Sequence, residues 1–181
     1  MPEESGKNRG RGRGPKKEKS EFDQQTVDLA RVTRVTKGGK QLSFRACLVI
    51  GDRAGRVGYG IDKGKDVQIA MEKAGNQARK NIIRVPMLYE TIPHRVEAKF
   101  KAGRIMIKPA PAGSGIIAGS AVRTILELAG VPNASAKVLG KTTNSITLVK
   151  ATFAALQSFL PRARQRAAGA KTPLIALPQK I

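Results

Sequence analysis

A glycine pair between two segments of β-branched residues constrains the fold of this chain more than any other feature. Residues 27–36 are rich in valine and threonine and predict a strand. The run Lys37-Gly38-Gly39-Lys40 follows, and it signals a hairpin because glycine reaches positive φ without steric cost. The returning strand, residues 41–50, turns alternate apolar side chains toward one face: Leu42, Phe44, Ala46 and Leu48. The folded part of the chain is therefore expected to begin with an antiparallel hairpin.

The residues after this hairpin complete a first unit. Gly51-Asp52 predicts a turn and residues 56–61 a third strand. From Asp66 to about Ile82, apolar residues recur at helical spacing: Val67, Ala70, Met71, Ala74 and Ala78. Residues 22–88 are therefore expected to form three antiparallel strands with one helix packed on the sheet. This β-β-β-α order is similar to a double-stranded-RNA-binding domain that lacks its leading helix.

A second unit is expected beyond a junction bracketed by Pro86 and Pro93. Within residues 89–160 the pattern predicts strands at 94–101 and 104–108, a Gly/Pro/Ala-rich loop at 109–119, a helix at 121–129, a strand at 135–139 and a helix to about 159. Gly130 is the expected stop of the first helix, and Asn144 or Ser145 the cap of the second. This unit is α/β with two layers, so the whole chain is assigned to the α+β class.

Both ends of the chain are expected to lie outside these units. Residues 1–21 contain an Arg-Gly repeat and lysines but no apolar side chain after Met1, so we expect a disordered basic tail. Residues 161–181 are basic and interrupted by proline, and their apolar run at 174–177 is too short to fold alone. We expect them to form a basic C-terminal arm that orders on a partner.

The charge of the chain indicates the kind of partner. Lysine and arginine total 34 against 13 acids, a formal net charge of +21, and residues 98–181 hold thirteen bases but one acid, Glu127. Charge of this size favours a polyphosphate such as RNA or DNA. No apolar run approaches the length that spans a membrane, and the first twenty residues lack an apolar core, so we do not expect them to be a secretory signal. A single cysteine, Cys47, excludes a disulfide framework and a multi-cysteine zinc site.

Folded, largely helical RNA is the ligand that the sequence favours. The chain has seven aromatic residues and no tryptophan, whereas single-strand binders stack bases on aromatic side chains. No helix-turn-helix, zinc finger or heptad repeat supports reading of the DNA major groove. The hairpin tip with Lys37 and Lys40, together with Arg31 and Arg34 on its strand, is the first predicted RNA contact. The alternative is a plain turn flanked by solubilising lysines.

The glycine-rich loop at 109–119 precedes a helix, a place where backbone amides bind phosphate. It matches neither a Walker loop nor a dinucleotide fingerprint, but it is similar to the phosphate loop of galactokinase-like and mevalonate-kinase-like enzymes. Phosphoryl transfer requires carboxylates that hold a metal, and residues 98–181 offer only Glu127. We therefore expect no enzyme, and assign the loop's backbone donors to an RNA phosphate, with tight loop packing as the alternative. The residues assigned here are Lys108, Gly113, Ser114, Gly115 and Arg123.

Two blocks of residues resemble one family. The first runs from Gly39 to Ala46 and continues through Val49-Ile50-Gly51-Asp52 to Gly55-Arg56-Val57-Gly58-Tyr59-Gly60. The second runs from Lys108-Pro109-Ala110 through Gly113-Ser114-Gly115-Ile116-Ile117-Ala118-Gly119 to Arg123 and Leu126-Glu127-Leu128-Ala129-Gly130. Together they resemble bacterial-type small-subunit ribosomal protein five, over roughly residues 27–158.

This resemblance implies a fold, a function and a set of partners. It implies a double-stranded-RNA-binding-like first domain and a second domain whose fold is shared with the metabolite kinases above. It also implies a structural constituent of the small ribosomal subunit that binds the subunit's ribosomal RNA (rRNA) and supports assembly, translational accuracy and the entrance of mRNA. Ribosomal proteins four and eight are the implied neighbours, with mRNA as a further contact and no membrane or cofactor. A cytoplasmic ribosome of bacterial type is expected in preference to an organelle ribosome.

The resemblance also assigns residues. It places residues 32–40 near the spectinomycin site, and Gly115 and Arg123 on a face associated with accuracy and with protein four. The predicted rRNA contacts outside the hairpin and the loop are Arg45, Arg53, Arg56, Lys63, Lys65, Arg84, His94 and Lys141. Residues 141–152 depart from the family pattern because a proline is missing, although Lys150 keeps a basic charge. A free double-stranded-RNA-binding chaperone or regulator, with no place in the subunit, is the alternative function.

Overall fold

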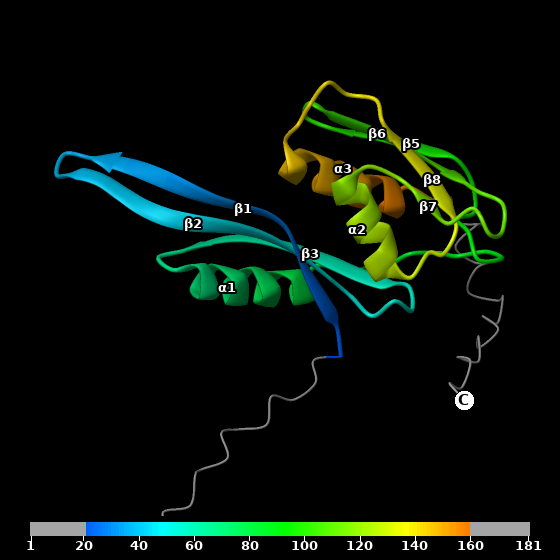
Figure 1. Cartoon of the computed structure of the whole chain (residues 1–181), viewed down its shortest axis with the longest axis horizontal. Coiled ribbons are helices and arrows are strands. Elements are labelled where there is room, and N and C mark those ends of the chain that lie inside the picture. Colours follow the sequence, from blue (N-terminus) through cyan, green and yellow to red (C-terminus); the bar gives the residue numbers. More distant parts are fainter. Residues whose placement is uncertain (1–20, 160–181) are drawn as a thin grey trace, which may run out of the picture.

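The computed structural model describes residues 21–159, so the predictions for the C-terminal arm and for all but the last residue of the N-terminal tail lie outside the described residues. Within this range the chain forms two four-stranded sheets and three helices (Figure 1). Helices α2 and α3 lie between the two sheets, and α1 covers the opposite face of the first sheet (Figure 1). This arrangement confirms the α+β class. None of the described helices is both long and apolar enough to cross a bilayer.

The first sheet has the order β1-β2-β3-β4, and all of its pairings are antiparallel. Its elements are β1 (Asp23–Thr36), β2 (Gly39–Gly51), β3 (Arg56–Gly64), α1 (Val67–Lys80) and β4 (Ile82–Arg84). The three predicted strands and the helix are confirmed. Strand β4 was not predicted, and the helix ends at Lys80 rather than near Ile82, because Asn81 caps it.

Helix α1 packs closely on β3 because both surfaces are built from small residues. Ala70, Ala74 and Ala78 are buried on the helix, and a Cβ atom added to Gly60 of β3 would lie 1.9 Å from the carbonyl oxygen of Ala74. Asp66 caps the helix, since its carboxylate accepts a hydrogen bond from the amide of Val67 at 2.7 Å. Met71 shares the helical spacing of the buried alanines but is 37% exposed.

The second sheet has the order β5-β6-β8-β7. Its unit contains β5 (Val96–Phe100), β6 (Gly103–Pro109), β7 (Ile116–Ile117), α2 (Ser120–Ala129), β8 (Ala134–Val138) and α3 (Ser145–Gln157). Gly130 ends α2 with a φ of 75°, and the Asn144 side chain accepts from the amide of Ile146 at 3.0 Å, so both predicted helix ends are confirmed. Strand β7 was not predicted, because it lies inside the glycine-rich loop and pairs with β8 in parallel.

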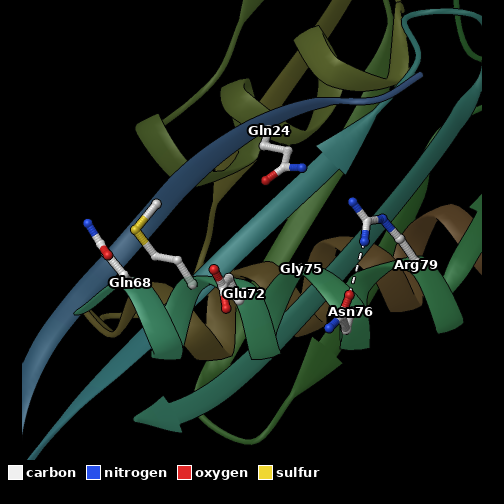
Figure 2. Close-up of a pocket in the computed structure, with 7 residues that line it drawn as sticks. Gln24, Gln68, Glu72, Gly75, Asn76 and Arg79 are labelled. Carbon is white, nitrogen blue, oxygen red and sulfur yellow. Dashed lines mark hydrogen bonds between the residues drawn. The ribbon is translucent and has the colours of Figure 1, made fainter. Parts of the chain in front are cut away.

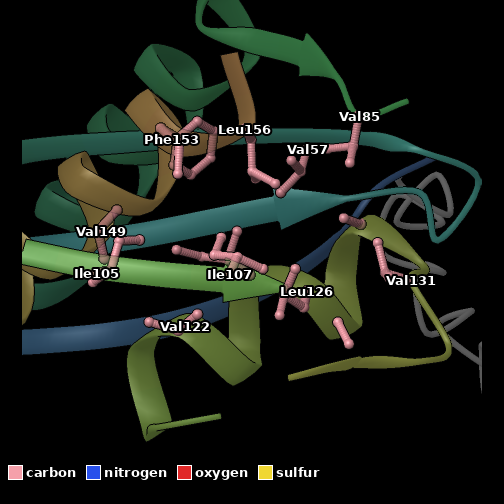
Figure 3. Close-up of a cluster of buried hydrophobic side chains, with 14 of the residues drawn as sticks. Val57, Val85, Ile105, Ile107, Val122, Leu126, Val131, Val149, Phe153 and Leu156 are labelled. Carbon is pink, nitrogen blue, oxygen red and sulfur yellow. The ribbon is translucent and has the colours of Figure 1, made fainter. Parts of the chain in front are cut away.

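One large hydrophobic core joins the two units (Figure 3). It combines side chains of both sheets with those of α2 and α3, including Val57, Ile105, Ile107, Leu126, Phe153 and Leu156. Strand β2 serves two cores, because Cys47 and Val49 point into this one while Ala46, Leu48 and Ile50 pack against α1. Leu42, predicted on the same face as Leu48, is 46% exposed because it lies beyond the end of the helix.

The end of α2 is fastened to the turn between β2 and β3. The amide of Arg53 donates to the carbonyl of Leu128, and that of Gly55 to the carbonyl of Ala129, both at 3.0 Å. At Gly130 a Cβ atom would lie 1.9 Å from the carbonyl oxygen of Arg53. The two units therefore contact each other through backbone as well as through the shared core.

Candidate nucleic-acid interface

The hairpin of β1 and β2 projects from the body of the molecule (Figure 1). Pairing of β2 with β3 ends at Phe44 and Gly64, so residues 32–43 pair only with each other. Thr36 pairs with Gly39 across a two-residue turn, and the Thr36 hydroxyl donates to the carbonyl of Gly39 at 3.1 Å. Of the two glycines only Gly39 has a positive φ, 125°. A two-stranded ribbon of this kind is open to a ligand on both faces and at its tip.

The predicted hairpin cations are distributed around this ribbon. Arg31 and Lys40 lie on the face that continues toward α1, because they alternate in step with Phe44, Ala46 and Leu48. Arg34, paired with Gln41, lies on the other face, and Lys37 is at the tip. All four side chains are exposed, and within residues 21–159 none of them forms an ion pair. Their charge is therefore available to a polyanion.

The predicted arginines at the base of the hairpin are already engaged. Arg45 pairs with Asp28 at 3.3 Å, Arg53 with Asp23 at 2.9 Å, and Arg56 with Asp52 at 2.5 Å. The Arg56 guanidinium also lies 5.1 Å from the centre of the Phe22 ring. These arginines stabilise the local structure, so each presents less net charge to a ligand than the tip lysines do.

Asp52 shows why the turn between β2 and β3 has this form. Partial burial of the carboxylate opposes its ionisation, but hydrogen bonds from the Arg56 side chain and from the amides of Ala54 and Arg56 outweigh this and lower its pKa. The charged carboxylate thereby organises the turn that meets the end of α2.

The remaining predicted cations are scattered over the surface. Lys63 and Lys65 are exposed where β3 leads into α1, and Lys141 is exposed ahead of α3. Arg84 of β4 lies directly opposite Arg56 of β3 in the strand register, so two like charges are neighbours there. His94 is half-buried, and its ring meets that of Phe159 edge-on at 5.3 Å between centroids, so part of its surface is occupied by packing.

The glycine-rich loop is folded onto Asn133, a residue that the sequence analysis missed. The side-chain oxygen of Asn133, which is 5% exposed overall, accepts from the amides of Gly113 and Gly115 at 3.1 Å each. The Ser114 amide donates to the carbonyl of Pro111 at 3.2 Å. Each of these three amides therefore already has an acceptor within the chain, and their assignment to an RNA phosphate stays a prediction. The sequence indicates only weakly that Asn133 is an acceptor, namely in that an asparagine occurs shortly after the helix stop at Gly130.

Two predicted RNA contacts near this loop, Lys108 and Arg123, differ in whether an acid of the chain already pairs with them. Lys108 is exposed on β6 and forms no ion pair within the described residues. Arg123 on α2 pairs with Glu127 at 2.9 Å. Glu127, the one acid of residues 98–181, is thus held by an arginine on the same helix. Within residues 21–159 no group of three or more potential metal ligands occurs.

An open groove of about 540 Å³ lies between β1 and α1 (Figure 2). Its lining is mainly polar and comes from Gln24, Gln68, Met71, Glu72, Gly75, Asn76 and Arg79. Arg79 donates to the side-chain oxygen of Asn76 at 3.0 Å, as the dashed line in Figure 2 shows. The groove exists because α1 packs over β2 and β3 and leaves β1 uncovered.

Comparison with known proteins decides the family. The family model "Ribosomal protein S5, N-terminal domain" matches residues 22–86, and "Ribosomal protein S5, C-terminal domain" matches residues 98–168. The chain belongs to the ribosomal protein S5 family. Ribosomal proteins of this family are structural components, so membership also confirms the expectation that the chain is not an enzyme.

Relatives of the S5 family occur in bacteria and in a chloroplast. "Small ribosomal subunit protein uS5c" of Spinacia oleracea is 50% identical over 82% of this chain, which spans about half (49%) of that relative. "Small ribosomal subunit protein uS5" of Protochlamydia amoebophila is 44% identical over 82% of this chain and 90% of its own length. The protein of the same name in Thermotoga neapolitana is 45% identical over 77% of this chain and 78% of its own length. Identity to these relatives does not separate a bacterial from an organelle ribosome.

Proposed function

We propose that this chain is a structural constituent of the small ribosomal subunit that binds the subunit's rRNA through the hairpin of β1 and β2. The observation that carries the proposal is the hairpin tip, where Lys37 and Lys40 are exposed and unpaired on a ribbon that packs against no other described element. Membership of the S5 family supports the ribosomal location. Phosphate contacts by such cations position a protein on RNA without reading its sequence.

Arginines and lysines of the described residues differ in whether they form ion pairs, and this difference supports the proposal. Every ion pair within residues 21–159 uses an arginine, while none of the lysines in that range is paired with an acid. Arginine suits both fixed pairs with carboxylates and phosphate contacts, and lysine also binds phosphate as a flexible point charge. Within residues 21–159 the charges of Lys37 and Lys40 are therefore not neutralised by an acid.

Finer roles rest on the family resemblance. We propose that Gly115 and the exposed face of α2 around Arg123 contact ribosomal protein four and influence accuracy, that ribosomal protein eight is a second neighbour, and that the hairpin lies near the path of mRNA. Gly115 and Arg123 flank β7 in the sequence and both reach the surface, which supports a shared contact. A bacterial-type cytoplasmic ribosome stays a prediction of the same kind.

Sedimentation of the native subunit tests the main proposal. The wild-type chain is expected to travel with the small subunit at moderate salt, and a chain found only in free fractions would overturn the proposal. The variant K37Q/K40Q is expected to bind small-subunit rRNA with a salt slope that is smaller by about 1.4–1.8, since each phosphate contact contributes about 0.7–0.9. An unchanged slope would mean that the hairpin is only a turn.

The alternative, a free double-stranded-RNA-binding chaperone, predicts a different result. Such a protein binds unrelated RNA duplexes as tightly as small-subunit rRNA, and it leaves the subunit at moderate salt. A competition experiment with an unrelated duplex of equal length separates the two functions.

A further inference from the structure

The outer face of the second sheet has an unusual composition. Val96, Ile105 and Ile107 point inward to the core with α2 and α3, so their neighbours along the strands point outward. The strand register arranges these outward residues in three rows across the sheet. The rows are Lys99, Arg104 and Leu139; Glu97, Met106 and Lys137; and Lys108, Ser135 and Ile117. We refer to these nine residues as the outer face.

Charge on the outer face is unbalanced. Four of its side chains are cationic and one, Glu97, is anionic, and Lys99 stands directly opposite Arg104. Like charges directly opposite each other destabilise a sheet. Glu97 already accepts from Arg104 at 3.0 Å and from Arg95 at 2.5 Å, so it has little capacity to neutralise the lysines. An anionic ligand would remove this repulsion.

Three aliphatic side chains lie among these cations. Ile117 is 61% exposed and Leu139 44% exposed, and Met106 is half-buried at the centre. From strand geometry, Arg104 and Lys108 stand about 13 Å apart along β6, and Lys137 lies about 8 Å from each. Aliphatic groups are thus surrounded by cations on this face of the sheet. Within residues 21–159, no helix packs on this surface, as Figure 1 shows.

We propose that the outer face binds the minor groove of an RNA helix, as a second rRNA contact in addition to the hairpin. The minor groove of A-form RNA is wide and shallow, and it presents ribose and base edges between two lines of phosphates. Lys108, Lys137 and Arg104 contact the phosphates, and Met106 and Ile117 lie against the riboses. This inference rests on the proposed function, because it takes rRNA as the ligand.

A protein partner fits the same surface less well. Protein interfaces are enriched in aromatic residues and depleted in lysine. The outer face has three lysines and no aromatic side chain among its nine residues. Its composition is therefore closer to a phosphate-binding surface than to a protein interface.

The test uses the full-length chain and a protein-free transcript of small-subunit rRNA. The variant K108Q/K137Q is compared with the matched control K73Q/K80Q, in which two exposed lysines of α1 are changed in the same way. We expect the salt slope of K108Q/K137Q to fall by about 1.4–1.8 and that of the control to stay at the wild-type value. K108R/K137R is expected to restore the slope, and I117S is expected to weaken binding at every salt concentration without changing the slope.

The binding results distinguish the outer-face inference from the proposed function of the hairpin. If K108Q/K137Q binds the transcript as the wild type does, the outer face does not contact RNA and the inference is overturned. If that variant also fails to enter subunits assembled with the other proteins, a protein occupies the face instead. If K37Q/K40Q weakens binding while K108Q/K137Q does not, the proposed function stands alone, and if the wild type does not bind the transcript, both fall.

Discussion

The contact between α1 and β3 makes a quantitative prediction about one glycine. In Gly60→Ala the new Cβ atom would lie 1.9 Å from the carbonyl oxygen of Ala74, whereas Cβ atoms essentially never approach another atom closer than 3.0 Å. The helix must therefore move away by at least about 1.1 Å, because a backbone carbonyl cannot rotate aside as a side chain does. This movement loosens the contacts of Ala70, Ala74 and Ala78 with the sheet. Overpacking of this kind costs about 1–3 kcal/mol, and we expect the upper end.

Gly75 on α1 provides a matched control within the same interface. A Cβ atom at Gly75 would lie 3.5 Å from Leu48, an ordinary contact, and alanine is favoured over glycine inside a helix by about 0.8–1.0 kcal/mol. Gly75→Ala is therefore expected to raise the free energy of unfolding slightly, and Gly60→Ala to lower it.

Urea unfolding followed by circular dichroism measures the free energy of unfolding of both variants, and thermal unfolding measures their Tm. A loss of 3 kcal/mol corresponds to a Tm lower by about 6–12 °C for a chain of this size. If the free energy of unfolding of Gly60→Ala lies within about 0.5 kcal/mol of the wild-type value, α1 does not pack this closely on β3.

Three further predictions follow from single contacts. Asn133→Ala leaves the amides of Gly113 and Gly115 without their acceptor, so we expect a loss of about 1–3 kcal/mol and faster hydrogen exchange at both amides; unchanged protection contradicts this. The pKa of Asp52 is lowered by folding, so its stabilisation is present above its unfolded pKa near 3.8 and is lost as the pH falls through the folded value. The stability gap between wild type and Asp52→Asn should therefore narrow below about pH 4, and a gap that is constant with pH would be inconsistent with this role. Burial raises the pKa of Cys47 to about 11, with a further contribution from Asp28, so a thiol reagent at neutral pH should label this residue only as fast as the chain unfolds; rapid labelling of the native chain would show an open core.

Local features of the fold were predictable from neighbouring residues. The hairpin turn, the cap at Asn144 and the stop at Gly130 depend on a few adjacent positions, and the structure has each of them. Strand β4 was missed because its three residues are held only by pairing with β3. Exposure of Met71 could not be predicted, because helical spacing reports a face of the helix and not how much of that face the sheet covers.

The candidate site was predictable in part. Exposure of Lys37 and Lys40 at the hairpin tip agrees with the sequence analysis, and whether they contact RNA stays a prediction. The internal acceptor of the Gly113 and Gly115 amides was not predicted, because Asn133 lies 20 and 18 residues further along the chain. No local pattern links an amide to an acceptor at that distance.

The sequence alone determined where most strands and helices form, how strongly basic the chain is and which family it resembles, since all three depend on residue type and spacing. Tertiary structure decided which charges are free. Arg45, Arg53 and Arg56 find acids through the folding of β1 and of the β2–β3 turn, while lysines across both sheets are left unpaired. It also decided that the two units share one core and that the outer face collects cations from β5, β6 and β8. The physical reason is that sheet order and register bring together residues that are remote in sequence, and these are set by burial of the whole core.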